Sequence, residues 1–362
     1  MIPRMIPRAA YQAIDLYAPN RAPCEVDLSD NTNLWGVPPA AERAIREAAV
    51  ATVTRYPSLY APGLKEALAA YLGVAPDMVV TGCGSDDVLD SAIRAFCEPG
   101  ERVAVPEPSF AMIPIFARMN GLEPVLVPLA GGTALDADAM LATGARVIYL
   151  CSPNNPTGGL LDADAVGRVV REAPGVVILD EAYAEFAERN GLDLLAASDR
   201  LLVCRTMSKA FGLAGLRVGY VAGAPALVAE VEKSRGPYKV NALAERAAAA
   251  ALTEDLAWVG RHVREAVAVR ERLAAELRAR GLAPLPSQAN FVLVPVAGAP
   301  AVAARMRQRG VAVRPFPALP AIGDALRISV GPWGMVGRAL EELDRALEER
   351  NLVPGEVGGQ RA

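Results

Sequence analysis

The chain has 362 residues, of which 52% are hydrophobic and 22% charged, so it is not a disordered chain and has ample apolar material for one large domain or two unequal ones. Its formal net charge of −4 provides no basic field for nucleic acid or an anionic membrane, and no apolar run approaches the roughly 18 residues of a membrane-spanning helix. Five scattered cysteines without a CxxC pair fit a reducing compartment, and the single histidine excludes an HExxH metal site. We therefore expect a globular, cytoplasmic protein that binds neither nucleic acid, membrane nor metal.

From residue 40 onward, helical and strand patterns alternate, which is typical of an α/β layer on a mostly parallel sheet. The predicted strands are short apolar and β-branched runs, most of them continuous, as expected of strands buried on both faces. These seven strands cover residues 78–81, 102–105, 125–127, 147–150, 176–179, 201–203 and 218–221. Helices are predicted at residues 40–54, 64–72, 85–96, 109–119 and 162–172.

The pattern changes after Gly236, where long helical stretches precede short strands and two further helices. The helices are predicted at residues 243–251, 256–280, 301–309 and 336–350, and the strands at 291–294, 311–314 and 326–330. This order favours a second, smaller α+β domain. We assign residues 40–235 to the large domain, and residues 1–39 with 236–362 to the small domain and its N-terminal arm.

The segment Gly82-Cys-Gly-Ser-Asp-Asp87 follows the first predicted strand and opens a helix. Free backbone N–H groups at a helix start, preceded by glycines, form a cradle for phosphate. Because the pattern is GxGxxD rather than GxGxxG, it favours a phosphate-bearing ligand and argues against NAD. A tight turn with Ser85 as the helix N-cap is an equally good interpretation.

The segment Ser152-Pro-Asn-Asn-Pro-Thr-Gly158 follows the predicted strand at 147–150. Its prolines restrict the backbone, and its two Asn amides can hold a ligand oxygen at the carboxyl end of the strand, where ligands of open α/β sheets bind. The alternative is a proline-rich turn without a ligand.

The segment Leu179-Asp-Glu-Ala-Tyr183 ends the predicted strand at 176–179. A carboxylate in that position either caps the next element or pairs with a buried cation, and the residues alone favour the cap. Asp180 and Tyr183 are three residues apart, so both could face one ligand.

Lysine is scarce, because only four of the 37 basic residues are Lys and an Arg guanidinium cannot lose its proton. Lys209 lies among small and apolar residues, with hydroxyl groups shortly before it at 206 and 208 and with Arg217 eight residues on. Desolvation and a nearby cation lower the pKa of an amine and make it a nucleophile toward carbonyls. The alternative is a lysine at a helix start that extends to water.

Taken together, these motifs resemble the fold-type I pyridoxal-phosphate (PLP) enzymes of the class I and II aminotransferases and, more narrowly, the histidinol-phosphate aminotransferase family. The likeness covers nearly the whole chain, because further segments match in the family's order. Those segments are Arg55–Pro57, Leu64–Gly73, Pro106–Phe110, Pro237–Asn241, Gln288–Phe291, Val313–Pro315 and Leu326–Gly331. The resemblance implies a PLP-binding large domain on a mostly parallel seven-stranded sheet, a smaller α+β domain, and a homodimer.

The resemblance also implies roles toward the cofactor. Lys209 would bond covalently to the cofactor aldehyde and then move the substrate Cα proton, and Asp180 would pair with the protonated ring nitrogen. Asn155 and Tyr183 would hydrogen-bond the ring hydroxyl, and Phe110 would stack on the ring. The phosphate would be held by Gly84, Ser85, Asp86, Thr206, Ser208 and Arg217, together with Tyr56 of the partner subunit.

For the substrates, an amino donor and a 2-oxo acid, the resemblance implies that Arg327 binds a carboxylate beside Asn155. Arg314 would bind the distal anion of the substrate, and Tyr17 would cover the site. These side chains are therefore the predicted substrate-binding residues.

Three segments depart from the family pattern. Thr32 and Leu34 stand in an Asn-Thr-Asn-Leu stretch where the family has Asn-Glu-Asn-Pro, Lys239 stands where Asn is usual, and Pro332–Met335 replaces a charged segment. We expect all three on the substrate side of the site, so they leave the cofactor assignment intact and bear on substrate choice.

The sequence thus predicts a homodimeric PLP aminotransferase that moves an amino group between histidinol phosphate and 2-oxoglutarate, a step of histidine biosynthesis. An aromatic or other amino acid aminotransferase, and a PLP decarboxylase of the threonine-phosphate type, remain alternatives. A PLP-sensing transcriptional regulator is disfavoured, because the roughly 40 residues before the first helix are too few for a DNA-binding domain and lack a helix-turn-helix pattern.

Overall fold

The computed structural model describes residues 8–12, 14–16 and 22–352, and its centre is a seven-stranded sheet in the order β2-β8-β7-β6-β5-β3-β4. Neighbouring strands are parallel except around β8, which runs antiparallel to β2 and β7. The strands are β2 (Val79–Cys83), β3 (Arg102–Glu107), β4 (Glu123–Pro128), β5 (Val147–Cys151), β6 (Val176–Asp180), β7 (Leu201–Thr206) and β8 (Val218–Gly223). The predicted mostly parallel sheet is confirmed, and each strand continues one to three residues past its predicted end.

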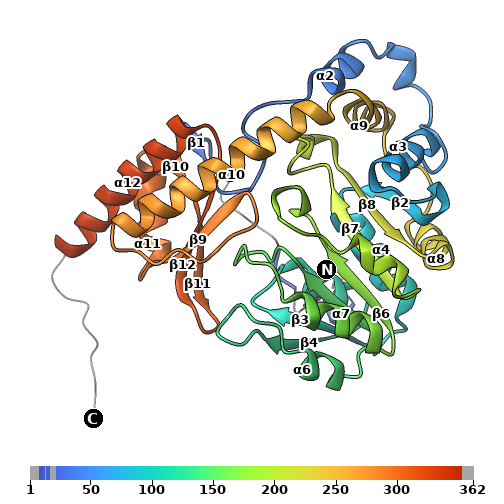
Figure 1. Cartoon of the computed structure of the whole chain (residues 1–362), viewed down its shortest axis with the longest axis horizontal. Helices are drawn as coiled ribbons and strands as arrows, with labels where there is room; N and C mark the ends of the chain where they lie inside the picture. Colours follow the sequence, from blue (N-terminus) through green and yellow to red (C-terminus); the bar gives the residue numbers. More distant parts are fainter. Residues whose placement is uncertain (1–7, 13, 17–21, 353–362) are drawn as a thin grey trace, which may run out of the picture.

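Helices cover both faces of this sheet (Figure 1). One face packs against α4, α5 and α8, and the other against α6 and α7, with α3 and α9 at its β2–β8 end. The helices up to residue 235 are α1 (Ala9–Gln12), α2 (Pro39–Arg46), α3 (Pro62–Leu72), α4 (Ser85–Phe96), α5 (Met112–Met119), α6 (Ala137–Ala142), α7 (Ala163–Glu172) and α8 (Pro225–Arg235). The bounds of α4 are those predicted, whereas α5 begins three residues later than predicted.

The prediction of one helix over residues 40–54 is wrong in its second half. α2 ends at Arg46, and a short 3-10 turn follows at Val50–Thr52. The side chains of Val50 and Val53 are exposed, so no packing holds this stretch in a helix. β-branched residues also lose rotamer freedom in a helix, so neither packing nor helix propensity favours an extension of α2 through this stretch.

The remaining elements gather around the long helix α10, beside the central sheet (Figure 1). A three-stranded antiparallel sheet has the order β11-β12-β9, and β1 pairs with β10 in parallel. The elements are α9 (Ala242–Glu254), α10 (Leu256–Ala279), α11 (Ala299–Gln308), α12 (Trp333–Leu352), β1 (Val26–Asp27), β9 (Phe291–Pro295), β10 (Val311–Ala312), β11 (Arg314–Leu319) and β12 (Gly323–Ser329). The strand predicted at 311–314 is therefore two strands, because the chain changes sheets at Val313.

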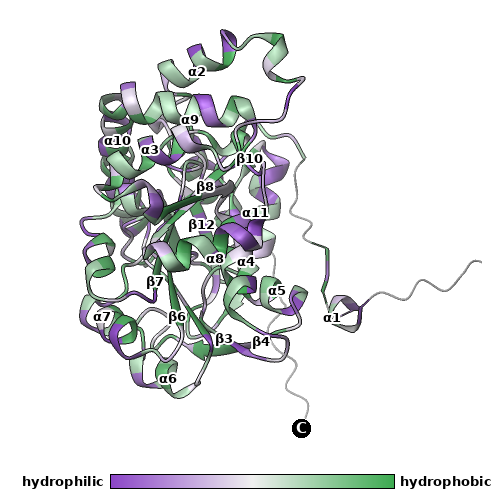
Figure 2. Cartoon of the chain, turned by 90° about the vertical axis from the view of Figure 1, so that its right-hand side faces the viewer, coloured by the Kyte–Doolittle hydropathy of each residue, from purple (hydrophilic) through white to green (hydrophobic). Residues whose placement is uncertain are grey.

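Contacts between the two groups of elements are extensive. α9 packs on α2, α3 and β8, whereas β1 of the N-terminal segment pairs with β10. The division at residues 235 and 236, and the assignment of residues 1–39 to the smaller domain, stay predictions. Figure 2 shows hydrophobic strands enclosed by helices that carry hydrophilic residues on their outer faces. Among the described helices, none is long and apolar enough to cross a membrane.

Candidate active site

The buried strand β6 carries Asp180 to the carboxyl end of the central sheet. In register it lies between Cys151 of β5 and Cys204 of β7. Its Oδ2 accepts a hydrogen bond from Tyr149 Oη at 2.7 Å, and its Oδ1 accepts one from Ala182 N at 3.1 Å. Burial raises the pKa of Asp180 to about 6, although both hydrogen bonds oppose the rise. The carboxyl is therefore mostly ionised at pH 7, and neither of these donors carries a charge.

The turn between β2 and α4 is packed too tightly for side chains at two glycines. Gly84 has a φ of 82°, and a Cβ there would collide with the guanidinium of Arg217. A Cβ at Gly219 would collide with the backbone N of Ser85. The interpretation of Ser85 as the N-cap is wrong, because Gly84 holds that position and no side chain caps the helix. The start of α4 therefore keeps the uncapped amides that bind an anion.

Charged side chains surround this helix start. Arg217 Nη2 lies 3.4 Å from Asp86 Oδ2, and Lys239 Nζ lies 2.9 Å from Asp87 Oδ1. Lys239 was expected on the substrate side, but its ammonium pairs with an acidic residue in the first turn of α4, beside the predicted phosphate site. The structure thus adds a second cation to the predicted phosphate site.

The end of β7 adds hydroxyl groups on the same side. Thr206 pairs in register with Gly219, the residue packed against Ser85. Ser208 N donates to Thr206 Oγ1 at 3.2 Å, and both side chains are buried. The backbone packing thus joins the predicted phosphate ligands of β2–α4, β7 and β8 into one region.

Lys209 follows β7 and is half-buried. Its Nζ donates to the carbonyl oxygen of Asp30 at 3.1 Å and lies 5.8 Å from the centre of the Tyr183 ring. Burial, followed by the nearby guanidinium of Arg327, lowers the pKa of Lys209 to about 8. At pH 7 about a tenth of such amines is neutral, against less than about a thousandth for an ordinary lysine.

Tyr183 is buried beside this lysine, and its ring meets that of Phe291 edge-on at 5.2 Å. Its Oη accepts a hydrogen bond from Asn31 Nδ2 at 3.0 Å. Burial raises the pKa of Tyr183 to about 12 although Arg327 lowers it, so the phenol keeps its proton at pH 7. With Asn31 as a donor, the Tyr183 hydroxyl proton is directed elsewhere, where a ligand oxygen could accept it.

Asn155 joins the central sheet to the three-stranded sheet. Arg327 Nη1 donates to Asn155 Oδ1 at 2.6 Å, and Arg327 Nη2 donates to the carbonyl oxygen of Ser29 at 2.8 Å. Arg314 stands opposite Arg327 on the neighbouring strand β11. Directly paired residues of antiparallel strands point to the same face of the sheet, so the two arginines lie side by side. The structure therefore brings three predicted substrate-binding residues together.

The structure does not test the predicted roles of three further residues. Phe110 is half-buried between β3 and α5 and packs on the core cluster of the α4 face. Tyr56 is 84% exposed and stacks on Tyr238 at 5.0 Å, so its proposed role toward a partner subunit stays a prediction. Tyr17 lies outside the described residues.

Two residues of the site were missed by the sequence analysis. Asn31 is buried and joins Tyr183 to β12, because Ser329 Oγ donates to Asn31 Oδ1 at 2.7 Å and accepts from Asn31 N at 2.9 Å. Tyr149 is the phenol that contacts Asp180. Asn31 could have been found because it stands in the Asn-Thr-Asn-Leu segment that departs from the family pattern. Tyr149 could have been found because it places a hydroxyl group in an otherwise aliphatic strand.

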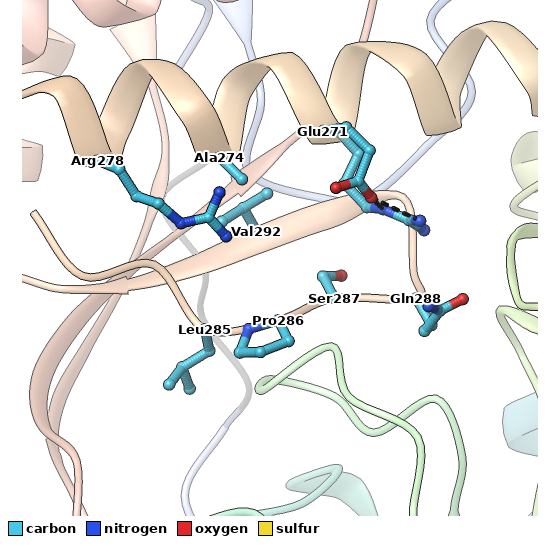
Figure 3. Close-up of a pocket in the computed structure, with 9 residues that line it drawn as sticks. Glu271, Ala274, Arg278, Leu285, Pro286, Ser287, Gln288 and Val292 are labelled. Carbon is cyan, nitrogen blue, oxygen red and sulfur yellow. Dashed lines mark hydrogen bonds and ion pairs between the residues drawn. The ribbon is translucent and has the colours of Figure 1, made fainter.

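A separate cavity of about 160 Å³ lies between α10 and residues 285–288 (Figure 3). Arg278 and Glu271 extend toward it from α10, and Ser287 and Gln288 face it from the opposite wall. None of the predicted site residues lines this cavity. Among the residues that the structure describes, no group of three or more His, Cys, Asp or Glu is placed to hold a metal ion.

Comparison with known proteins adds four findings. Residues 24–343 match the sequence profile of aminotransferase class I and II. A histidinol-phosphate aminotransferase of Methylibium petroleiphilum is 41% identical over 317 residues, which cover 85% of each chain. An aromatic amino acid aminotransferase of Corynebacterium glutamicum is 37% identical over 333 residues, 89% of this chain and 94% of that one. The structure of a Sinorhizobium meliloti histidinol-phosphate aminotransferase in complex with pyridoxal-5'-phosphate matches with a TM-score of 0.85 at 27% identity, over 98% of this chain and 99% of that one.

Proposed function

Because this chain belongs to the class I and II aminotransferases, we propose that it is a PLP enzyme that moves an amino group between histidinol phosphate and 2-oxoglutarate. The observation that carries the proposal is the convergence of Lys209, Asp180 and Tyr183 with the paired arginines Arg314 and Arg327. The reaction is a step of histidine biosynthesis.

The residues fit PLP at both of its charged ends. The uncapped start of α4, the Gly84–Gly219 packing and Arg217 make a cradle for a phosphate. At the other end, the buried carboxylate of Asp180 has only neutral donors among its described hydrogen bonds, so a protonated ring nitrogen would supply its counter-charge. When bound, the cofactor supplies an aldehyde that captures amines and a ring that accepts an electron pair.

The chain's own residues then orient the ligands and move the proton. Lys209, partly neutral at pH 7, would be the amine that holds the cofactor through its aldehyde, and the same amine would move a proton at the substrate Cα. Tyr183 and Asn155 would donate hydrogen bonds to the ring oxygen, and Phe110 would cover the ring. The chemical types of these side chains support these roles, and each of them can be tested by substitution.

The substrate assignment rests on the two arginines. A phosphate monoester carries close to two negative charges at pH 7 and calls for a planar, two-pronged donor such as Arg314. Arg327, held by Asn155 and Ser29, is oriented to receive the carboxylate of glutamate.

A second candidate is an aromatic amino acid aminotransferase, the activity of the Corynebacterium glutamicum relative. The rings of Phe291 and Phe316 lie 5.3 and 5.5 Å from the Arg327 guanidinium, so an apolar side chain would also find contacts beside the carboxylate site.

We further propose a homodimer in which Tyr56 reaches the cofactor phosphate of the partner subunit. Apolar side chains are exposed just before α2, along the segment between α2 and α3, and on the tyrosine stacked against that segment, and a second copy would cover them. They are Val37, Val50, Val53, Tyr56, Leu59 and Tyr238. A cytoplasmic location is proposed as well, and the five free cysteines fit it.

The test is a panel of amines offered to the PLP-loaded protein, read by cofactor absorbance, with 2-oxoglutarate as acceptor. Histidinol phosphate should convert the cofactor to its amine form, and 2-oxoglutarate should restore it. Lys209→Ala is the control without the nucleophile. Turnover of aromatic amino acids with none of histidinol phosphate would select the second candidate.

A further inference from the structure

Tyr149 lies in the middle of β5 and is fully buried. It is two residues before Cys151, the register partner of Asp180, so its side chain stands on the same face of the sheet as Asp180. Its Oη donates to Asp180 Oδ2 at 2.7 Å. We propose that Tyr149 is a positioning residue whose hydroxyl orients the Asp180 carboxylate and holds it ionised for the cofactor ring nitrogen. The inference rests on the proposed function of this site.

The surroundings of Asp180 explain why such a donor matters. Burial penalises the charged carboxylate and raises its pKa, while the bonds from Tyr149 and Ala182 N lower it. Negative charges nearby raise it further. The titratable groups that face Asp180 are Tyr149 and Cys151 of β5, Cys204 of β7, Lys209 beyond β7, Asp86 of α4, and Glu181 and Tyr183 after β6. Among the interactions that lower the pKa of Asp180, the hydrogen bond from Tyr149 is therefore the largest.

A phenol suits this role better than a cation. A Lys or Arg in the same place would neutralise the carboxylate and compete with the ring nitrogen for it. Burial and the neighbouring carboxylate hold the pKa of Tyr149 well above its ordinary value. The phenol therefore keeps its proton and acts toward Asp180 only as a hydrogen-bond donor. The hydrogen bond fixes one carboxylate oxygen and leaves the negative charge in place.

The test compares the full-length wild type with Tyr149→Phe, which removes the hydroxyl and keeps the ring. Tyr220→Phe is the matched control, because Tyr220 is also fully buried in the central sheet and its hydroxyl has no hydrogen-bond partner in the structure. The readout is the pH titration of the Asp180 carboxyl band in the infrared difference spectrum of cofactor-free protein. The band is assigned by its loss in Asp180→Asn.

We expect the midpoint of this titration to rise by about one to two pH units in Tyr149→Phe and to stay unchanged in Tyr220→Phe. In PLP-loaded protein, the ring nitrogen of ¹⁵N-labelled cofactor should lose its proton at lower pH in Tyr149→Phe. An unchanged carboxyl titration would overturn the proposal.

Two further outcomes are separable. If the wild type binds no PLP, or Asp180→Asn leaves the ring nitrogen protonated as before, the proposed function fails, while the cofactor-free titration still decides whether Tyr149 holds Asp180 ionised. If Tyr149→Phe does not fold, wild type with ¹³C-labelled tyrosine provides the readout. The Tyr149 C–O band should move as Asp180 titrates and stay still in Asp180→Asn, and a band that ignores pH in the wild type would refute the contact.

Discussion

Replacing Arg314 by Ala separates the two halves of the proposed reaction. Histidinol phosphate has a phosphate and no carboxylate, so it depends on Arg314, whereas glutamate depends on Arg327. A charge-assisted bidentate pair contributes about 1.5–3 kcal/mol, which corresponds to roughly ten- to over a hundredfold in affinity. Arg314 is half-buried, and water screens part of its interaction, so we expect the lower end of that range for the histidinol phosphate KM.

Arg327→Ala should have the opposite pattern and a larger effect. Arg327 is 7% exposed and donates to Asn155 Oδ1 and to the Ser29 carbonyl, so its loss leaves the buried Ser29 carbonyl and the half-buried Asn155 amide oxygen without this donor. The glutamate half-reaction should therefore slow by about a hundredfold or more, with a smaller loss for histidinol phosphate.

The assay is single-turnover absorbance of each half-reaction in both variants. Arg278→Ala is the matched control, because Arg278 is exposed and lines the separate cavity beside α10, which none of the predicted site residues lines. Equal slowing of both half-reactions by Arg314→Ala would refute the division of labour between the two arginines. In that case the substrate anion is bound elsewhere.

Three further predictions concern the cofactor. The pKa of Lys209 is lowered to about 8, and only the neutral amine reacts. Stopped-flow absorbance should therefore show that cofactor-free protein captures PLP about tenfold faster for each pH unit below pH 8, and that the rate levels off above pH 8. A rate that does not change from pH 6 to 9 would argue against the lowered pKa. Asp180→Ala should weaken PLP retention in equilibrium dialysis and remove most activity, because the ring nitrogen loses its counter-charge; unchanged activity would leave Asp180 as a structural residue only. Tyr56→Ala should weaken PLP retention without loss of the dimer, and light scattering that finds an active monomer would exclude the proposed role across subunits.

The central sheet could be predicted because its strands are buried on both faces. Continuous apolar runs such as Val176–Leu179 carry that signal in the local sequence, and Gly84 before Ser85 marks the start of α4. The helix over residues 40–54 was predicted too long, because periodicity does not reveal that Val50 and Val53 remain exposed in this chain.

The site residues also divide into those that local sequence could predict and those that depend on contacts between distant segments. Lys209 and Asp180 stand in local motifs, whereas the contact of Asn31 with Tyr183 joins residues 152 positions apart and depends on how the N-terminal segment crosses β12. The pairing of Lys239 with Asp87 also joins distant segments. The pairing of Arg314 with Arg327 follows from strand register, which no single-residue pattern contains.

The attachment site of the cofactor tests the account most directly. The chain has only four lysines, Lys65, Lys209, Lys233 and Lys239. Borohydride reduction of the PLP-loaded protein, followed by peptide mass mapping, locates the lysine that carries the cofactor. The account predicts the reduced cofactor on Lys209 alone, and its presence on another lysine, or on none, would contradict it.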